Sequence, residues 1–202
     1  MATATMYKGL AVCLTASALL AAAPLGPANE MTLQPESKLW VDGTSTVRGF
    51  TCSTTGFTAK IESEKPQSIA ALMLGTKVVR TVVADFPTDK LDCKNGTMNE
   101  HMRKAIKAED NPTIEFRLGS YDMLTSEGQI KGQLRGTLVM GGVEKPVVID
   151  ATAKPEGEGK LRVTGTTKLR MTEWGLKPPT LMFGTMKVNE NVQVGFDLLL
   201  KD

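Results

Sequence analysis

The feature that most constrains this sequence is an alternation of apolar and polar residues over positions 129–154, with Gly141-Gly142 near its centre. Alternation with a period of two is typical of an antiparallel strand that has one buried face. The two glycines supply the positive φ angles that a tight reversal requires, and Pro146 fits the beginning or edge of the returning strand. The stretch therefore predicts a long β-hairpin with one apolar and one polar face.

Several other segments predict strands, so that the expected set covers residues 38–43, 47–61, 78–86, 113–118, 129–140, 145–154, 160–171 and 187–200. A long antiparallel sheet tends to curl, and closing it removes its exposed edges. A closed sheet with one apolar face is a barrel with an apolar interior, although a two-sheet sandwich would use the same pattern. The expected fold class is all-β, an extended antiparallel barrel of about eight strands.

Two segments favour helices. From Thr97 to Ala108 apolar residues recur at helical spacing, Thr97 and Glu100 match a capping box, and Asn111-Pro112 is expected to stop the helix. A shorter helix is expected within residues 62–76, where Ala, Leu and Met are frequent, with a strand as the alternative.

The first 23 residues have the composition of a secretory signal peptide. Lys8 is the only charged residue before Glu30, an apolar run covers residues 10–20, and Ala21-Ala22-Ala23 precede Pro24. The run is short for a membrane span, so the mature chain is expected to have no integral membrane span; a membrane-anchoring helix is the alternative. We expect cleavage near residue 23 or 28, a loose lead-in over 24–36, one domain over 37–202, and an exported protein.

Two cysteines, Cys52 and Cys93, remain after the signal peptide and Cys13 are removed. An even number of cysteines in an exported protein favours a disulfide. Its loop would stabilise the fold by roughly 4 kcal/mol in the chain-entropy model. A zinc site lacks histidines, because His101 is the only one, and a redox pair normally has the spacing Cys-x-x-Cys.

Charge and composition leave little support for nucleic-acid binding or catalysis. The formal net charge is +2, and acidic and basic residues are interspersed, so nucleic acid is not an expected partner. His101 lies next to the apolar stripe of the predicted helix and is expected to be a packed or surface residue. Phosphate-binding and metal-binding motifs are not evident. We therefore expect a protein that is not an enzyme and has no metal or cofactor.

Three stretches in order give the sequence its family resemblance. They are Trp40 to Phe50 (WVDGTSTVRGF), Met98 to Met102 (MNEHM) followed by residues 111–116 (NPTIEF), and residues 136–147 (GTLVMGGVEKPV). This ordered set resembles the YceI-like family of exported proteins. The resemblance implies a lipocalin-like antiparallel barrel with a helix at its side or mouth, and a long isoprenoid or other amphiphilic chain in the lumen. It also implies that the exported protein is periplasmic or secreted.

The resemblance supplies no fixed contact residues, so candidate lipid-binding positions rest on strand parity and on the helix stripe. They are Phe116, Leu134, Leu138, Met140, Val147, Ile149, Val163, Leu169, Val194, Phe196, Met98 and Met102. Inward small residues are expected to leave room for a ligand: Gly132, Gly136, Ala151, Gly165 and Gly195, the last on the opposite parity and a candidate bulge. Trp174 is expected either at the rim or as a loop anchor.

The function expected is transport, storage or sequestration of a bound isoprenoid or fatty chain, with a hydrophobic small molecule as partner and a homodimer as a further possibility. The alternative is a structural or interaction module of the cell envelope whose barrel or sandwich is filled with side chains.

Overall fold

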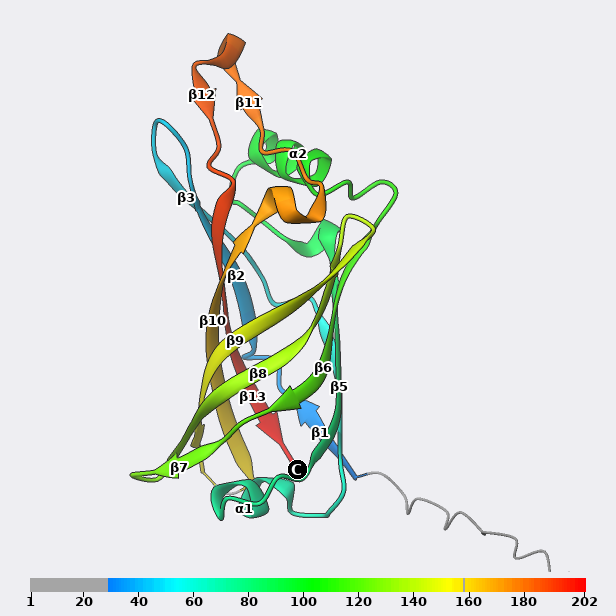
Figure 1. Ribbon diagram of the computed structural model, residues 1–202, viewed down its shortest axis with the longest axis vertical. Coiled ribbons are helices and arrows are strands. Elements are labelled where there is room, and N and C mark those ends of the chain that lie inside the picture. Colours follow the sequence, from blue (N-terminus) through cyan, green and yellow to red (C-terminus); the bar gives the residue numbers. More distant parts are fainter. Residues whose placement is uncertain (1–28, 158) are drawn as a thin grey trace, which may run out of the picture.

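The barrel is closed by strands that are far apart in the sequence. The computed structural model describes residues 29–157 and 159–202; the predicted signal peptide and its cleavage position lie outside them. Eight antiparallel strands pair in the cyclic order β1-β4-β5-β6-β8-β9-β10-β13, and β13 pairs back with β1 at Thr32–Lys201 and Leu33–Leu200 (Figure 1). The closed barrel confirms the predicted fold class and excludes the two-sheet sandwich.

The strands have the following bounds: β1 Asn29–Leu33, β2 Lys38–Thr44, β3 Gly49–Thr54, β4 Thr58–Ser63, β5 Val79–Pro87, β6 Thr113–Tyr121, β7 Leu124–Ser126, β8 Gln129–Met140, β9 Val143–Pro155, β10 Lys160–Arg170, β11 Thr180–Leu181, β12 Met186–Lys187 and β13 Asn191–Lys201. The helices are α1 Ser68–Met73 and α2 Gly96–Ala105, and the short 3₁₀ turns are η1 Thr88–Lys90, η2 Met171–Trp174 and η3 Met182–Gly184.

The predicted hairpin is β8 and β9. Its register runs without a shift from Ile130–Ala153 to Met140–Val143. Gly141 and Gly142 form the two-residue connection with φ angles of 58° and 79°. A two-residue turn with positive φ at both positions matches the twist of the flanking strands, which explains how such a long hairpin keeps one register.

β2 and β3 extend the wall at the upper end of the barrel. β13 pairs with β1 near its C-terminal end and with β2 over residues 193–197, and β3 then pairs with β2. The segment after β5 covers the free edge of β3 through a bridge between Ser53 and Asp92, in which each backbone N–H donates to the other residue's carbonyl at 2.9 Å. On this side the wall of the barrel therefore extends beyond the eight strands that close the ring.

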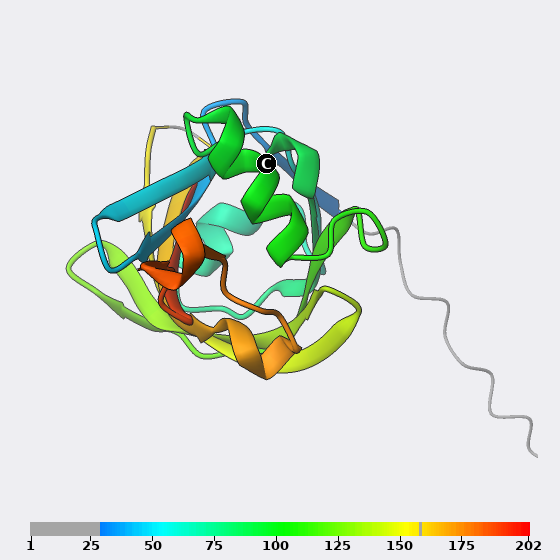
Figure 2. The same ribbon diagram turned by 90° about the horizontal axis from the view of Figure 1, so that it is seen from above.

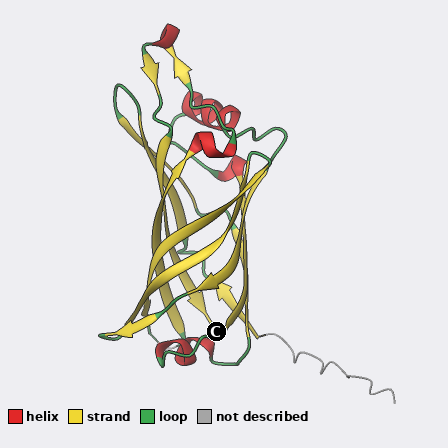
Figure 3. Cartoon of the chain, viewed as in Figure 1, coloured by secondary structure: helices red, strands yellow, loops and turns green. Residues whose placement is uncertain are grey.

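The two helices lie at opposite ends of the barrel (Figures 1 and 3). At the lower end, Ile69 and Leu72 of α1 are buried in a cluster that includes Met31, Ile61 and Val78. At the upper end, α2 crosses over the opening, as the view from above shows (Figure 2). The confirmed helices thus cap the barrel rather than lie along its outer face. Within the described residues, none of the helices is long and apolar enough to cross a membrane.

Four boundary predictions were wrong. The lead-in over 24–36 contains β1, whose pairing with β4 and β13 makes it part of the barrel. The strand predicted over 47–61 is two strands, because the chain turns at Gly56, whose N–H donates to the Thr54 hydroxyl at 3.0 Å. The strand predicted over 187–200 is β12 and a separate β13. The capping box does not form, because α2 begins earlier and the Asn95 side chain accepts from the Met98 N–H at 3.0 Å.

Candidate functional site

The barrel encloses a cavity of about 490 Å³. The cluster around α1 forms its floor, and a second buried cluster, which includes Ile106, Trp174 and Leu176, packs at the upper end. Between them the inward side chains are almost all aliphatic or aromatic. A cavity of this size and lining fits an apolar small molecule rather than a charged one.

The structure places all twelve candidate positions around this cavity. They are Phe116 on β6; Leu134, Leu138 and Met140 on β8; Val147 and Ile149 on β9; Val163 and Leu169 on β10; Val194 and Phe196 on β13; and Met98 and Met102 on α2. Strand parity brought them together because the inward side chains of neighbouring strands meet in one lumen. Their contact with a bound chain stays a prediction.

Sequence reasoning missed most of the wall that the strands from β2 to β6 contribute. These lining residues are Leu39, Val41, Phe50, Phe57, Ala59, Val82, Ala84, Phe86 and Leu118. The alternation of Leu39 with Val41, and of Phe57 with Ala59 and Ile61, was a usable signal. Phe57 and Ala59 were missed because residues 47–61 were treated as one strand, which gives the residues before and after Gly56 the wrong relative parity.

The small residues were expected to leave room for a ligand, but the space beside them is not simply empty. A Cβ on Gly136 would lie 2.5 Å from the Phe116 ring, and a Cβ on Gly165 would lie 2.5 Å from the Phe196 ring. These glycines let the two rings lie against the wall. Backbone of Asp122 approaches Gly132 closely. The expected bulge at Gly195 is absent from its continuous register with Trp40, whose ring covers Gly195.

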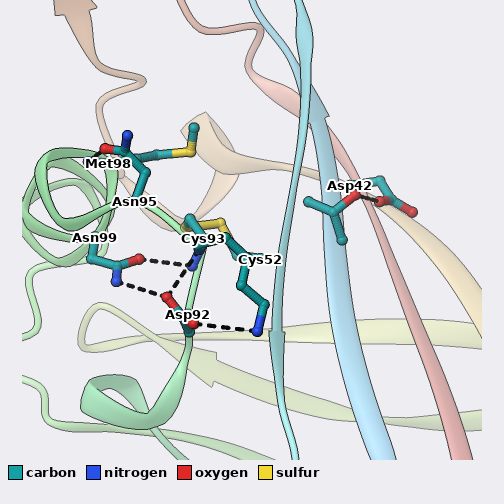
Figure 4. Close-up of a disulfide and its surroundings, with 9 residues drawn as sticks. Asp42, Cys52, Asp92, Cys93, Asn95, Met98 and Asn99 are labelled. Carbon is teal, nitrogen blue, oxygen red and sulfur yellow. Dashed lines mark hydrogen bonds and ion pairs between the residues drawn. A yellow bond between two sulfur atoms is a disulfide. The ribbon is translucent and has the colours of Figure 1, made fainter.

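The disulfide predicted between Cys52 and Cys93 is present and joins β3 to the segment before α2 (Figure 4). Asn99 strengthens this junction: its side-chain oxygen accepts from the Cys93 N–H at 2.7 Å, and its amide donates to Asp92 at 2.9 Å. The Asn99 hydrogen bond, followed by one from the Lys94 N–H, lowers the pKa of Asp92 below its ordinary value. The N-terminal end of α2 is thus fixed across the mouth.

The other side of the mouth is held by Trp174. Its side chain is buried at 2% exposure, and its indole N–H donates to the Leu138 carbonyl at 3.2 Å. Trp174 is therefore a loop anchor in the upper cluster and not a rim residue. It fixes the chain that leads from β10 to the β11–β12 hairpin.

Polar groups at the cavity lie mainly at its upper end. Ser45 and Arg48 come from the β2–β3 turn, and Asn95, Thr97 and His101 come from the beginning of α2. Arg48, Asn95 and Thr97 are exposed to solvent, so the cavity reaches the surface here. A chain held in the apolar lumen would have its polar end at this mouth.

Tyr121 is a polar group of the lower wall. Its hydroxyl accepts a hydrogen bond from the Val79 N–H at 3.1 Å, and burial raises the pKa of its phenol above the ordinary value. Among the described residues, no group of three or more His, Cys, Asp or Glu side chains is placed to hold a metal ion. The site that the residues build is one for binding an apolar molecule.

A closed antiparallel barrel of eight strands with an apolar lumen defines a lipocalin-like class of protein. The chain belongs to the YceI-like family, because the sequence model of the YceI-like domain matches residues 32–200. This confirms the family resemblance. Among proteins of curated function, none matches this sequence.

Solved structures show the same fold at low sequence identity. BcnA of Burkholderia cenocepacia has a TM-score of 0.64 and 14% identity, over 81% of this chain and 96% of that one. A YceI protein of Campylobacter jejuni has a TM-score of 0.57 and 17% identity, over 72% and 81%. A polyisoprenoid-binding domain of Saccharophagus degradans, implicated in plant cell wall breakdown, has a TM-score of 0.58 and 9% identity, over 85% and 97%.

Proposed function

We propose that this protein binds one long apolar chain, isoprenoid or fatty, in the barrel lumen, and serves to transport, store or sequester it outside the cytoplasm. The cavity of about 490 Å³ with its apolar lining is the observation that carries the proposal. The family membership and the likeness to a polyisoprenoid-binding domain support it. Export rests on the signal-peptide composition of residues 1–23.

The dimensions of the barrel suit an extended chain. β8 has 12 residues, which at about 3.3 Å per residue gives about 40 Å along the strand. A strand tilt of about 40° reduces this to about 30 Å along the barrel axis. Each CH₂ group transferred from water contributes about 0.8 kcal/mol, so burial alone can supply most of the affinity. The polar mouth then leaves a headgroup in contact with water.

Binding without chemistry is the role that this lining supports. His101 is the only histidine of the chain, and the described side chains that line the lumen are almost all aliphatic or aromatic. An apolar chain is held by surface burial, which needs shape and dryness rather than reactive groups. We therefore propose a non-enzymatic carrier.

The direct test is to express the complete 202-residue sequence, purify the protein and measure its intact mass under native conditions, before and after extraction with organic solvent. We expect an added mass that disappears on extraction, and a long-chain lipid in the extract. A protein that carries no added mass and takes up neither isoprenoids nor fatty acids would contradict the proposal and favour the filled structural module.

A lumen-filling variant makes the test specific. Ala151 faces the cavity between Gly132 and Gly165 of the neighbouring strands. Ala151→Phe should insert a ring into the lumen and lower chain binding at least tenfold. Thr152→Phe on the outer face of the same strand is the matched control and should bind as before. Equal binding by the two variants would show that the chain lies elsewhere.

A further inference from the structure

We propose that the upper end of the barrel docks on the surface of an anionic lipid bilayer, so that the bound chain passes directly between bilayer and lumen. This inference rests on the proposed function and adds the partner at the mouth. It concerns a surface that we call the upper tip, residues 44–48 and 180–189, which comprises the β2–β3 turn and the β11–β12 hairpin.

The two parts of the upper tip form one projection. The Thr46 N–H donates to the Lys187 carbonyl at 3.0 Å, the Asn189 N–H donates to the Thr44 carbonyl at 2.8 Å, and Ser45 bridges to Val188. In Figure 1 the β11–β12 hairpin extends beyond α2, and the β2–β3 turn reaches about the level of α2. They are therefore presented together to anything that approaches the mouth.

Two of the described apolar side chains of the upper tip are strongly exposed. Phe183 is fully exposed, at 110%, and Val47 is 66% exposed. Phe183 also has a φ of 55°, a left-handed conformation that is rare and costly for a bulky residue. Exposure of an aromatic ring to water is unfavourable, and this ring projects where it can enter an apolar surface that meets the upper tip.

The charges on the upper tip point to the chemistry of that surface. Arg48 and Lys187 are its only charged residues, and neither takes part in the ion pairs of the described residues. The first carboxylate after the tip, Glu190, is paired with Arg170 at 2.9 Å. An apolar tip flanked by unpaired cations suits a bilayer, where the Phe183 ring and the Val47 side chain enter the interface and the cations meet anionic headgroups.

The upper tip is also continuous with the cavity. Leu181, Met186 and Val188 belong to it and line the lumen at the mouth. A chain that leaves the cavity on this side therefore meets the apolar side chains of the β11–β12 hairpin, which also carries Phe183. The exposed leucines at the lower end, Leu74 and Leu124, do not line the cavity. Leu124 also has a carboxylate, that of Glu127, close to it in the sequence, which disfavours an anionic surface.

The test measures flotation of the protein, purified after expression of the complete sequence, with phosphatidylcholine vesicles that contain or lack phosphatidylglycerol. Phe183→Ser should weaken binding about tenfold. Arg48→Gln and Lys187→Gln should each weaken binding to the anionic vesicles about fivefold and leave binding to phosphatidylcholine alone unchanged. Leu124→Ser and Leu74→Ser are the matched controls and should bind as the unchanged protein does.

Two results would overturn the inference: equal vesicle binding by Phe183→Ser and Leu124→Ser, or no vesicle binding by the unchanged protein, which would assign the tip to a protein partner. Uptake of cis-parinaric acid from vesicle-free solution keeps this inference apart from the proposed function. Phe183→Ser and Val47→Ser should take up the probe normally. If the protein takes up the probe but does not bind vesicles, only the docking proposal is refuted. If it binds vesicles but does not take up the probe, only the proposed chain binding is refuted.

Discussion

Gly165 of β10 lies directly opposite Phe196 of β13, and the Phe196 ring occupies the space where a side chain on Gly165 would begin. Gly136 of β8 pairs with Leu118 of β6, and the ring of Phe116, two residues away on β6, occupies the space where a side chain on Gly136 would begin. In both pairs the missing side chain of a glycine lets an aromatic ring pack closely against the strand backbone. The lumen thus keeps large apolar rings at its surface and stays open along its axis.

Replacing Gly165 should therefore move a ring into the cavity. Gly165→Val is expected to displace Phe196, to lower the free energy of unfolding by about 1–3 kcal/mol through overpacking, and to weaken chain binding. Urea unfolding and probe uptake measure the two effects. Thr164→Val, on the exposed face, is the control. Full binding by Gly165→Val would mean that the chain does not pass this level of the barrel.

The disulfide should contribute to stability through the long loop that it closes. Cys52 and Cys93 are 41 residues apart, a loop for which the chain-entropy model gives about 4 kcal/mol. The double variant Cys52→Ser, Cys93→Ser should lose about this free energy of unfolding. A reducing agent should destabilise the unchanged protein and leave the double variant unaffected. A loss well under 1 kcal/mol would show that Asn99 and the Ser53–Asp92 bridge suffice to hold the junction.

The indole hydrogen bond of Trp174 can be removed while most of the ring is kept. Trp174→Phe leaves the Leu138 carbonyl without this donor, and a buried group that loses its partner costs about 1–3 kcal/mol. Thermal unfolding followed by circular dichroism measures the change without depending on tryptophan fluorescence. Trp40→Phe, whose ring still covers Gly195 on the outer face, should cost less. The reverse order would contradict the role of Trp174 as anchor.

The junction at Asp92 predicts a specific pH dependence. Its pKa is lower in the folded than in the unfolded protein, so the folded state binds fewer protons. The stabilisation is complete above the unfolded pKa of about 4 and is lost as the pH falls through the folded pKa. Asp92→Asn and Asn99→Ala should each flatten the acid side of the stability profile. Superimposable profiles for all three proteins would remove Asp92 from this account.

Strand parity predicted the lumen best where the register is continuous. From β8 to β10 the pairing has no shift, so the alternation of Leu134, Leu138, Ile149 and Val163 translates directly into a shared face. In the first half, the turn at Gly56 resets the parity. In the sequence, a glycine is compatible both with a turn between two strands and with a bend within one strand. The turn was therefore not predicted, and Phe57 and Ala59 were missed.

Other features depended on contacts that local sequence does not contain. The ring is closed by β1 and β13, which lie near the two ends of the chain, so β1 has little local pattern to reveal it. Asn95 and Thr97 are both good caps, and the hydrogen bond of Asn99 to Cys93 favours the earlier start. The packing of the Phe196 ring on Gly165 could be predicted only if the register between β10 and β13 were known.

The packed floor at α1 sets how the affinity of this protein should vary along a homologous series of chains. Each added CH₂ strengthens binding about fourfold as long as it enters the lumen. Once the tail meets Leu72 in this floor, further carbons remain beyond the mouth and add nothing. The affinity should therefore rise with chain length up to the length of the lumen and stay constant for longer chains.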